Sequence, residues 1–81
     1  MRVRVRYFAD AREAARRDGE DLDLAAGATV KDAVDALVRR HPALGSIAPR
    51  ARVAVDERFV GPDEALAEDA TLVLIPPVGG G

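Results

Sequence analysis

Apolar and polar residues alternate strictly over residues 2–8, where Val3, Val5 and Tyr7 share one face and arginines occupy the other. A period of two predicts a half-buried strand at the start of the chain. Shorter stretches of strand character follow at residues 22–24, 53–55, 59–60 and 71–75. The pattern therefore predicts five strands.

A different spacing marks residues 30–38, where apolar side chains recur every three or four residues as on one face of a helix. Thr29 with Asp32 three positions later predicts the N-terminal cap of this main helix, and Pro42 predicts its end. Asp10 and Glu13 resemble a capping box at the start of a shorter helix, which we expect to end at Gly19.

Strands at both ends of the chain and a long helix between them fit a mixed sheet wrapped around one main helix. We expect an α+β fold of the β-grasp kind over residues 1–75. In that architecture the first and last strands lie parallel at the sheet centre. Alternation then places Leu72 and Leu74 in the core, and it turns Val73 and Ile75 to the opposite face beside Phe8.

The last six residues are a diproline, a valine and three glycines, namely Pro76, Pro77, Val78, Gly79, Gly80 and Gly81. The prolines lack backbone donors, so they end the strand and direct the chain outward. Glycine has no Cβ, so residues 79–81 can thread a channel too narrow for side chains. We expect a flexible functional tail over residues 76–81 whose Gly81 carboxylate enters a partner's active site. The alternative is an ordinary frayed terminus.

A tail that acts as a substrate also requires a docking surface on the folded domain. Ordering backbone costs roughly 1–2 kcal/mol per residue, so gripping the tail alone consumes several kcal/mol. The sequence predicts a partner-binding apolar patch of Phe8, Val73 and Ile75, rimmed by arginines, with Arg6 and Arg12 nearby. The alternative is a two-layer protein with ordinary scattered apolar exposure.

Composition excludes several functions. With 81 residues the chain is one small domain without room for a substrate cleft of its own. A net charge of -2 with mixed signs gives no field that attracts nucleic acid, and the lack of cysteine excludes thiolate metal sites and a catalytic thiol. Because no apolar run reaches transmembrane length and no signal peptide follows Met1, we expect a cytoplasmic protein without a membrane partner.

Other chemically active groups are few. His41 is the one histidine, so no second imidazole can share a metal with it, and we predict no metal site. The acidic residues near residue 20 fall in turns and at strand edges, where we expect solvated charges: Asp18, Glu20, Asp21 and Asp23. No glycine-rich loop precedes a helix, so we expect no ATP binding by that route.

Three segments resemble a known family: RYFADARE at residues 6–13, VAVD at residues 53–56 and LVLIPPVGGG at residues 72–81. They are similar to the MoaD/ThiS family of ubiquitin-like sulfur carriers, which includes MoaD, the small subunit of molybdopterin synthase (molybdopterin converting factor subunit 1). The likeness covers essentially the whole chain. Its most specific part is the apolar strand, Pro-Pro-Val, one variable residue and a terminal Gly-Gly pair. Two positions depart from the family, because the turn at residues 68–71 lacks glycine and Tyr7 stands where Phe is common.

The resemblance implies that the tail carries sulfur. A ubiquitin-activating-like (MoeB-like) adenylyltransferase, using ATP and magnesium, would adenylate the Gly81 carboxylate, and a sulfur donor protein would convert it to a thiocarboxylate. In molybdopterin synthase the tail inserts into the large subunit (MoaE-like), which holds precursor Z. Two carriers in turn supply the dithiolene sulfurs within a heterotetramer. The catalytic groups would then lie on the large subunit, and this chain itself would bind no cofactor.

Three alternatives remain open from sequence. One is a ThiS-like carrier for thiamine thiazole or another sulfur-containing product, which shares the tail chemistry. A second is a ubiquitin-like modifier that forms isopeptide bonds to lysines. The third is an interaction module with an inert end.

Overall fold

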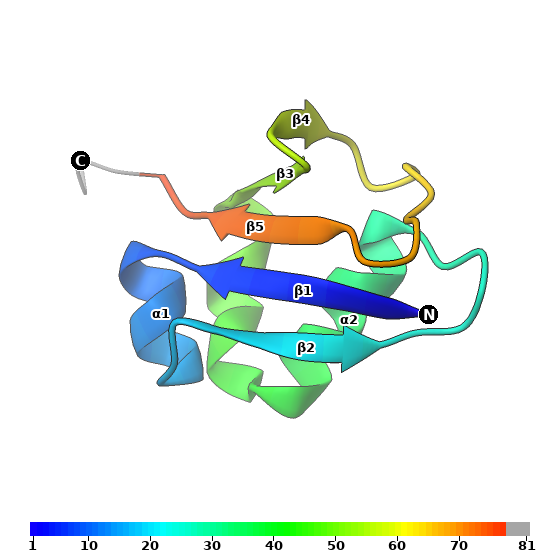
Figure 1. The fold of residues 1–81 in the computed structure, drawn as a ribbon. Coiled ribbons are helices and arrows are strands. Elements are labelled where there is room, and N and C mark those ends of the chain that lie inside the picture. Colours follow the sequence, from blue (N-terminus) through cyan, green and yellow to red (C-terminus); the bar gives the residue numbers. More distant parts are fainter. Residues whose placement is uncertain (78–81) are drawn as a thin grey trace.

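The computed structural model describes residues 1–77, within which one five-stranded sheet carries both helices on one face (Figure 1). The elements in chain order are β1 (Arg2–Tyr7), α1 (Ala9–Ala15), β2 (Gly19–Asp23), α2 (Val30–Arg40), β3 (Arg52–Val55), β4 (Arg58–Val60) and β5 (Thr71–Ile75). The strand order is β2-β1-β5-β3-β4. β1 and β5 are parallel neighbours and the other pairs are antiparallel. The predicted β-grasp fold is confirmed.

The core lies between the sheet and α2. Side chains on the inner face of β1 and β5 are almost completely buried, as the alternation predicts: Val3, Val5, Tyr7, Leu72 and Leu74. From α2, Val30, Ala33 and Leu37 pack against them. Two 3₁₀ turns, η1 (Pro42–Ser46) and η2 (Ala48–Arg50), follow α2, and Leu44 and Ile47 close the core beneath them.

The main helix begins as predicted. The Thr29 hydroxyl accepts a hydrogen bond from the Asp32 amide, and the Asp32 carboxylate accepts one from the Thr29 amide. This capping box satisfies two backbone donors that the first turn leaves free. α2 ends at Arg40, and Pro42 then starts η1.

The first helix differs from the prediction at both ends. α1 starts at Ala9, with Phe8 as its N-cap and no side-chain cap, so the predicted capping box of Asp10 and Glu13 is wrong. The helix ends at Ala15 because Arg16 adopts the left-handed conformation, with φ 60°. Gly19 opens β2 instead of ending the helix. A Cβ there would lie 2.5 Å from the Val5 carbonyl oxygen, so the close approach of β1 requires glycine.

A tight hairpin joins β3 and β4. Asp56 and Glu57 have positive φ values of 47° and 70°. A two-residue turn needs positive φ at both residues to match the right-handed twist of the two strands. The hairpin fixes the register so that Arg6, Val73, Ala54 and Phe59 form one row across four strands. By alternation this row lies on the outer face of the sheet, away from the helices.

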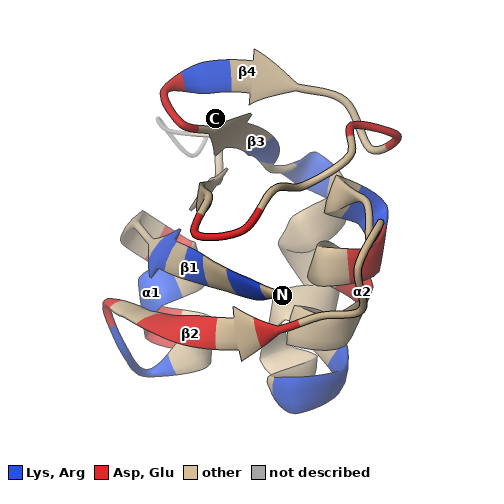
Figure 2. Ribbon diagram, turned by 45° about the vertical axis from the view of Figure 1, so that its right-hand side comes forward, with Lys and Arg blue, Asp and Glu red and all other residues tan. Residues whose placement is uncertain are grey.

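On the same outer face, opposite charges line the β1–β2 part of the sheet. Figure 2 shows basic positions along β1 beside acidic positions along β2. Their side chains form pairs, with Arg2–Asp23 at 3.6 Å and Arg4–Asp21 at 3.4 Å. All four side chains are largely exposed. Such pairs contribute little stability, and they leave no uniform basic surface on this pair of strands.

No helix within residues 1–77 has the length and apolar content to cross a bilayer.

The structure describes the first two residues of the predicted tail. Pro76 is buried and Pro77 is exposed where the chain leaves β5. Val78, Gly79, Gly80 and Gly81 lie outside the described residues, so the predicted boundary between domain and tail stays a prediction.

Candidate functional site

The end of β5 brings the predicted tail root and the predicted docking residues together. β1 and β5 run parallel, so their C-terminal ends lie at the same end of the sheet, where Phe8 follows β1 and Pro76 follows β5 (Figure 1). Whatever binds this end of the sheet therefore contacts the start of the tail as well. The predicted tail residues Val78 to Gly81 continue from here, outside the described residues.

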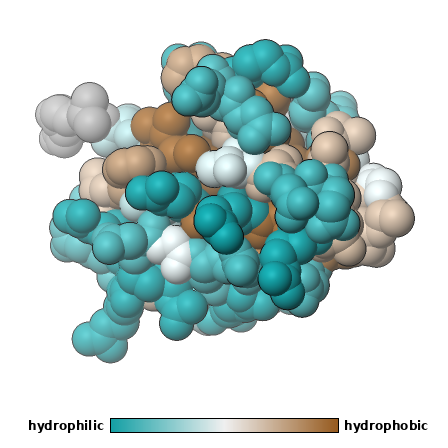
Figure 3. All heavy atoms as spheres, viewed as in Figure 1, coloured by the Kyte–Doolittle hydropathy of each residue, from teal (hydrophilic) through white to brown (hydrophobic). Residues whose placement is uncertain are grey.

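The outer face beside this end has a shallow apolar hollow of about 460 Å³, which we call the sheet-face patch. It is lined by Arg6, Phe8, Ala54, Asp56, Glu57, Thr71, Val73 and Ile75. Phe8 is 47% exposed, whereas Val73 and Ile75 are half-buried. Figure 3 shows hydrophobic atoms on this face near the end of β5, bordered by hydrophilic ones. Four of the predicted docking residues (Arg6, Phe8, Val73 and Ile75) thus line one surface.

The rim of this patch differs from the prediction. Arg6 lines one side, but Asp56 and Glu57 from the β3–β4 turn line the other, so the rim has both signs of charge. Arg12 does not line the patch. Its guanidinium lies 3.6 Å from the Asp18 carboxylate at the far end of α1. A complementary partner therefore needs apolar side chains at the centre and opposite charges at its two sides.

Phe59 lies next to the sheet-face patch, and we did not predict from the sequence that it belongs to this surface. Its ring is 56% exposed on the outer face, one strand beyond Ala54, and the Arg52 guanidinium lies 3.6 Å from the ring centroid. This stacking holds an arginine against an exposed aromatic ring. Strand alternation alone did not reveal it, because the β3–β4 register decides which face Phe59 occupies.

A partly buried polar cluster corrects the prediction for Glu20. Its side chain is only 5% exposed, although we expected a solvated charge. The Tyr7 hydroxyl donates to Glu20 Oε2 at 2.6 Å, and Arg40 donates to Oε1 at 2.7 Å. His41 Nε2 lies 2.7 Å from Oε2 and must carry the proton, since a carboxylate only accepts. The cluster ties the end of α2 to β1 and β2.

The pKa values of this cluster reflect the same contacts. Burial raises the pKa of Glu20, but hydrogen bonds from Tyr7, Arg40 and His41 outweigh it and lower the pKa to about 2. Burial, reinforced by the hydrogen bond to Glu20, raises the pKa of Tyr7 above its usual value. Glu20 is therefore ionised and Tyr7 protonated at neutral pH, which suits a structural contact. Among residues 1–77 no three histidine, cysteine or carboxylate side chains gather as a metal site.

We expect Glu20→Gln to lower the free energy of unfolding by about 2 kcal/mol at pH 7, because charge-assisted hydrogen bonds are stronger than neutral ones. A depressed pKa adds stability above the unfolded value of 4.5, and that stability is lost as the pH falls toward 2. The difference between the two proteins should therefore shrink at pH 3. Urea unfolding followed by circular dichroism at both pH values measures it.

Asp21→Asn is the matched control, because Asp21 lies on the same strand but is 45% exposed in its pair with Arg4. It should change stability by less than about 0.5 kcal/mol. An equal effect of the two substitutions would show that the Glu20 cluster adds nothing beyond an exposed ion pair.

Comparison with known proteins decides the family. The model of the ThiS family matches residues 5–81. This chain belongs to the ThiS family. The recognition from sequence is thereby confirmed, and the fold and the family together identify a ubiquitin-like sulfur-carrier protein.

Relatives of this ThiS-family protein have several roles. The molybdopterin synthase sulfur carrier subunit of Chlamydomonas reinhardtii is 34% identical over 83 residues, which cover 100% of both chains. SAMP1 of Haloferax volcanii, a small archaeal modifier protein, has a crystal structure that matches with a TM-score of 0.90 and 35% identity over 100% of both chains. A chain from the complex of subunits 1 and 2 of the Helicobacter pylori molybdopterin-converting factor has a TM-score of 0.73, with 100% of both chains covered. At 20% identity it shows only the shared fold.

Proposed function

We propose that this chain is the sulfur-carrier small subunit of molybdopterin synthase and that the Gly81 carboxylate is the group that carries sulfur. The match to the Chlamydomonas molybdopterin synthase carrier over the full length of both chains is the observation that supports this function most. The family match also extends to residue 81, so it includes the glycines on which the chemistry depends.

The proposed reaction requires activation of Gly81 first. A carboxylate is a poor electrophile, so a MoeB-like adenylyltransferase transfers AMP from ATP to Gly81 and releases pyrophosphate. Sulfide (HS⁻), which the sulfur donor protein supplies, then attacks the acyl carbon. AMP leaves and a thiocarboxylate forms, with ATP and magnesium bound by the activating enzyme. In this scheme Gly81 supplies the reacting atoms, and residues 76–80 guide and thread them.

Docking on the large subunit is the second part of the proposal. The sheet-face patch lies beside the root of the tail, so a MoaE-like large subunit that covers Phe8, Val73 and Ile75 receives Pro76 at the same time. Burial of the patch would offset the entropy lost when the tail is ordered. We propose a heterotetramer with carriers at opposite ends of a large-subunit dimer, located in the cytoplasm.

A small protein modifier is the second candidate function, and the match to SAMP1 favours it. Both functions begin with activation of the same carboxylate, so they differ in the acceptor and not in the carrier chemistry. A ThiS-like carrier for the thiamine thiazole differs likewise in the acceptor alone. The acceptor therefore has to be tested directly.

Reconstitution with thiocarboxylated chain tests the acceptor. We expect the chain, mixed with a molybdopterin synthase large subunit and precursor Z, to form molybdopterin and return to the carboxylate. Mixed with a thiazole synthase and its substrates, it should form at most trace thiazole. Product formation with the thiazole synthase alone would reject the molybdopterin assignment while leaving the carrier chemistry intact.

A further inference from the structure

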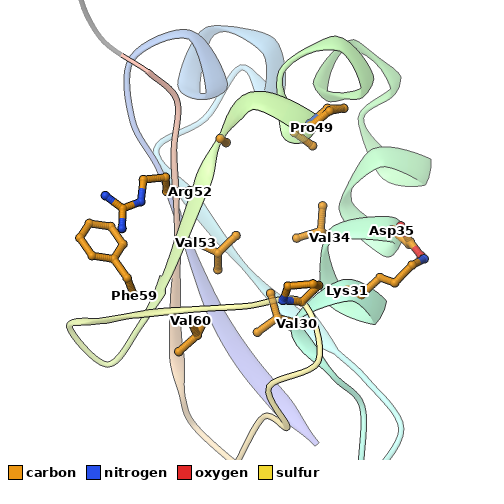
Figure 4. A pocket seen from close by; sticks show the side chains of 12 residues that line it. Val30, Lys31, Val34, Asp35, Pro49, Arg52, Val53, Phe59 and Val60 are labelled. Atoms are coloured by element: carbon orange, nitrogen blue, oxygen red, sulfur yellow. The ribbon is translucent and has the colours of Figure 1, made fainter.

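A second hollow lies on the opposite side of β3 from the sheet-face patch, between α2 and the β3–β4 hairpin. We call it the lateral groove. Its volume is about 530 Å³. The sheet edge extends past α2 here, so apolar side chains from both elements face an open space (Figure 4). The apolar residues that line it include Val30, Val34, Pro49, Ala51, Val53 and Val60.

The edge of β4 borders this groove and offers backbone groups for pairing. In an antiparallel pair, hydrogen-bonded and non-hydrogen-bonded positions alternate, and the pair next to a two-residue turn is hydrogen-bonded. Val55 and Arg58 flank the turn, so Ala54 and Phe59 take the alternate position. The amide and carbonyl of Phe59 therefore point away from β3. Within residues 1–77 they make no hydrogen bond outside the sheet.

The charged residues that line the groove indicate which charge a bound segment should have. Lys31 Nζ lies 2.7 Å from the Asp35 carboxylate, so these two charges satisfy each other. Arg52 stacks on the Phe59 ring, and among residues 1–77 no carboxylate lies within ion-pair distance of it. The groove therefore has an apolar floor, and Arg52 at its rim, against Phe59 on the outer face, is a cation that a carboxylate on the occupant can complement.

A second copy of the same chain fits this edge poorly. Antiparallel pairing of β4 with β4 of another copy through a two-fold axis would place the Arg52 side chains of both copies on the same face of the joined sheet. Arg58 already has Glu64 at 3.3 Å, and Arg52 has no carboxylate partner within residues 1–77, so the contact would add like charges. The edge favours a different chain that supplies negative charge.

We propose that the lateral groove binds an extended segment of a partner protein, which pairs with β4 and has the pattern aliphatic, acidic, aliphatic. The residue opposite Phe59 shares its face of the sheet, so an acidic side chain there reaches Arg52. The two flanking residues point to the other face, into the groove beside Val53 and Val60. Strand addition of this kind takes its affinity from the backbone and its specificity from alternate side chains.

Peptide selection on the full chain tests this proposal. The chain has no cysteine, so Glu13→Cys, on the exposed side of α1, provides one site for a biotin label away from the groove. Phage-displayed random nonapeptides are selected on this protein, and the enriched peptides are titrated into ¹⁵N-labelled chain. We expect the pattern aliphatic, acidic, aliphatic to be enriched, and the amide signals of Phe59, Val60 and Val34 to shift.

Two exposed arginines provide the matched comparison. Arg52→Glu should weaken the selected peptides by about 10-fold or more, and replacing the acidic residue of the peptide with lysine should restore binding. Arg50→Glu makes the same charge change in η2 outside the groove and should leave affinity unchanged. The proposal is overturned if no peptide is enriched, if the enriched peptides bind Arg52→Glu as tightly as wild type, or if the shifts fall on Phe8 and Val73.

Discussion

Deletion of Gly81 is expected to abolish sulfur transfer, with a loss of at least about 1,000-fold in the rate of molybdopterin formation. The shortened chain still ends in Gly-Gly, but its carboxylate is up to about 3.5 Å short of its normal reach. A displacement of about 1 Å at a reacting centre already costs on the order of 100-fold. Single-turnover formation of molybdopterin with a large subunit and precursor Z measures the loss.

Gly61→Ala is the control for that deletion. It changes a glycine of the folded domain at a position where an added Cβ meets no atom within 4 Å, and it leaves the tail unchanged. We expect the full transfer rate to remain, and both variants to unfold close to the wild-type temperature. Full transfer by the chain without Gly81 would reject the carrier mechanism.

Val73→Asp is expected to weaken binding of the large subunit by about 100-fold. The apolar contact of Val73 is lost, and the cost of removing a carboxylate from water in a closed interface exceeds what pairing with its neighbour Arg6 returns, together roughly 3 kcal/mol. Val73 is half-buried at the centre of the sheet-face patch, and its row neighbours are Arg6 and Ala54. Isothermal titration calorimetry with the purified large subunit measures the affinity.

Ala43→Asp makes a matched change away from the patch. Ala43 is exposed in η1 and lines no part of the sheet-face patch, so its substitution should leave the affinity within about twofold. The free energy of unfolding of both variants should be measured alongside. If Val73→Asp folds and binds as tightly as wild type, the large subunit does not dock on the sheet-face patch.

Most of the fold was predictable because its signals are local. The alternation of residues 2–7 and 71–75 gave two central strands and their buried faces. Thr29 and Asp32 gave the start of α2 through contacts three residues apart. α1 was placed less well, because its end depends on the left-handed Arg16 and on close packing of Gly19 against β1. Neither feature has a local signal.

The docking residues could be predicted from the sequence where strand alternation determines which face of the sheet a side chain occupies. Phe8, Val73 and Ile75 fall on one surface because strand parity puts them there. Phe59 and the acidic side of the rim required the register of the β3–β4 hairpin. Glu20 was missed although it has the same parity as the buried Leu22, because its partners Tyr7, Arg40 and His41 are distant in sequence.

The most direct test of the carrier function is the intact mass of the chain after incubation with its activating enzyme, ATP and a sulfide source. The account predicts the mass change of one oxygen replaced by sulfur, about 16 Da, located by fragmentation at Gly81. An unchanged mass, with the activating enzyme shown to be active on a control carrier, would contradict it.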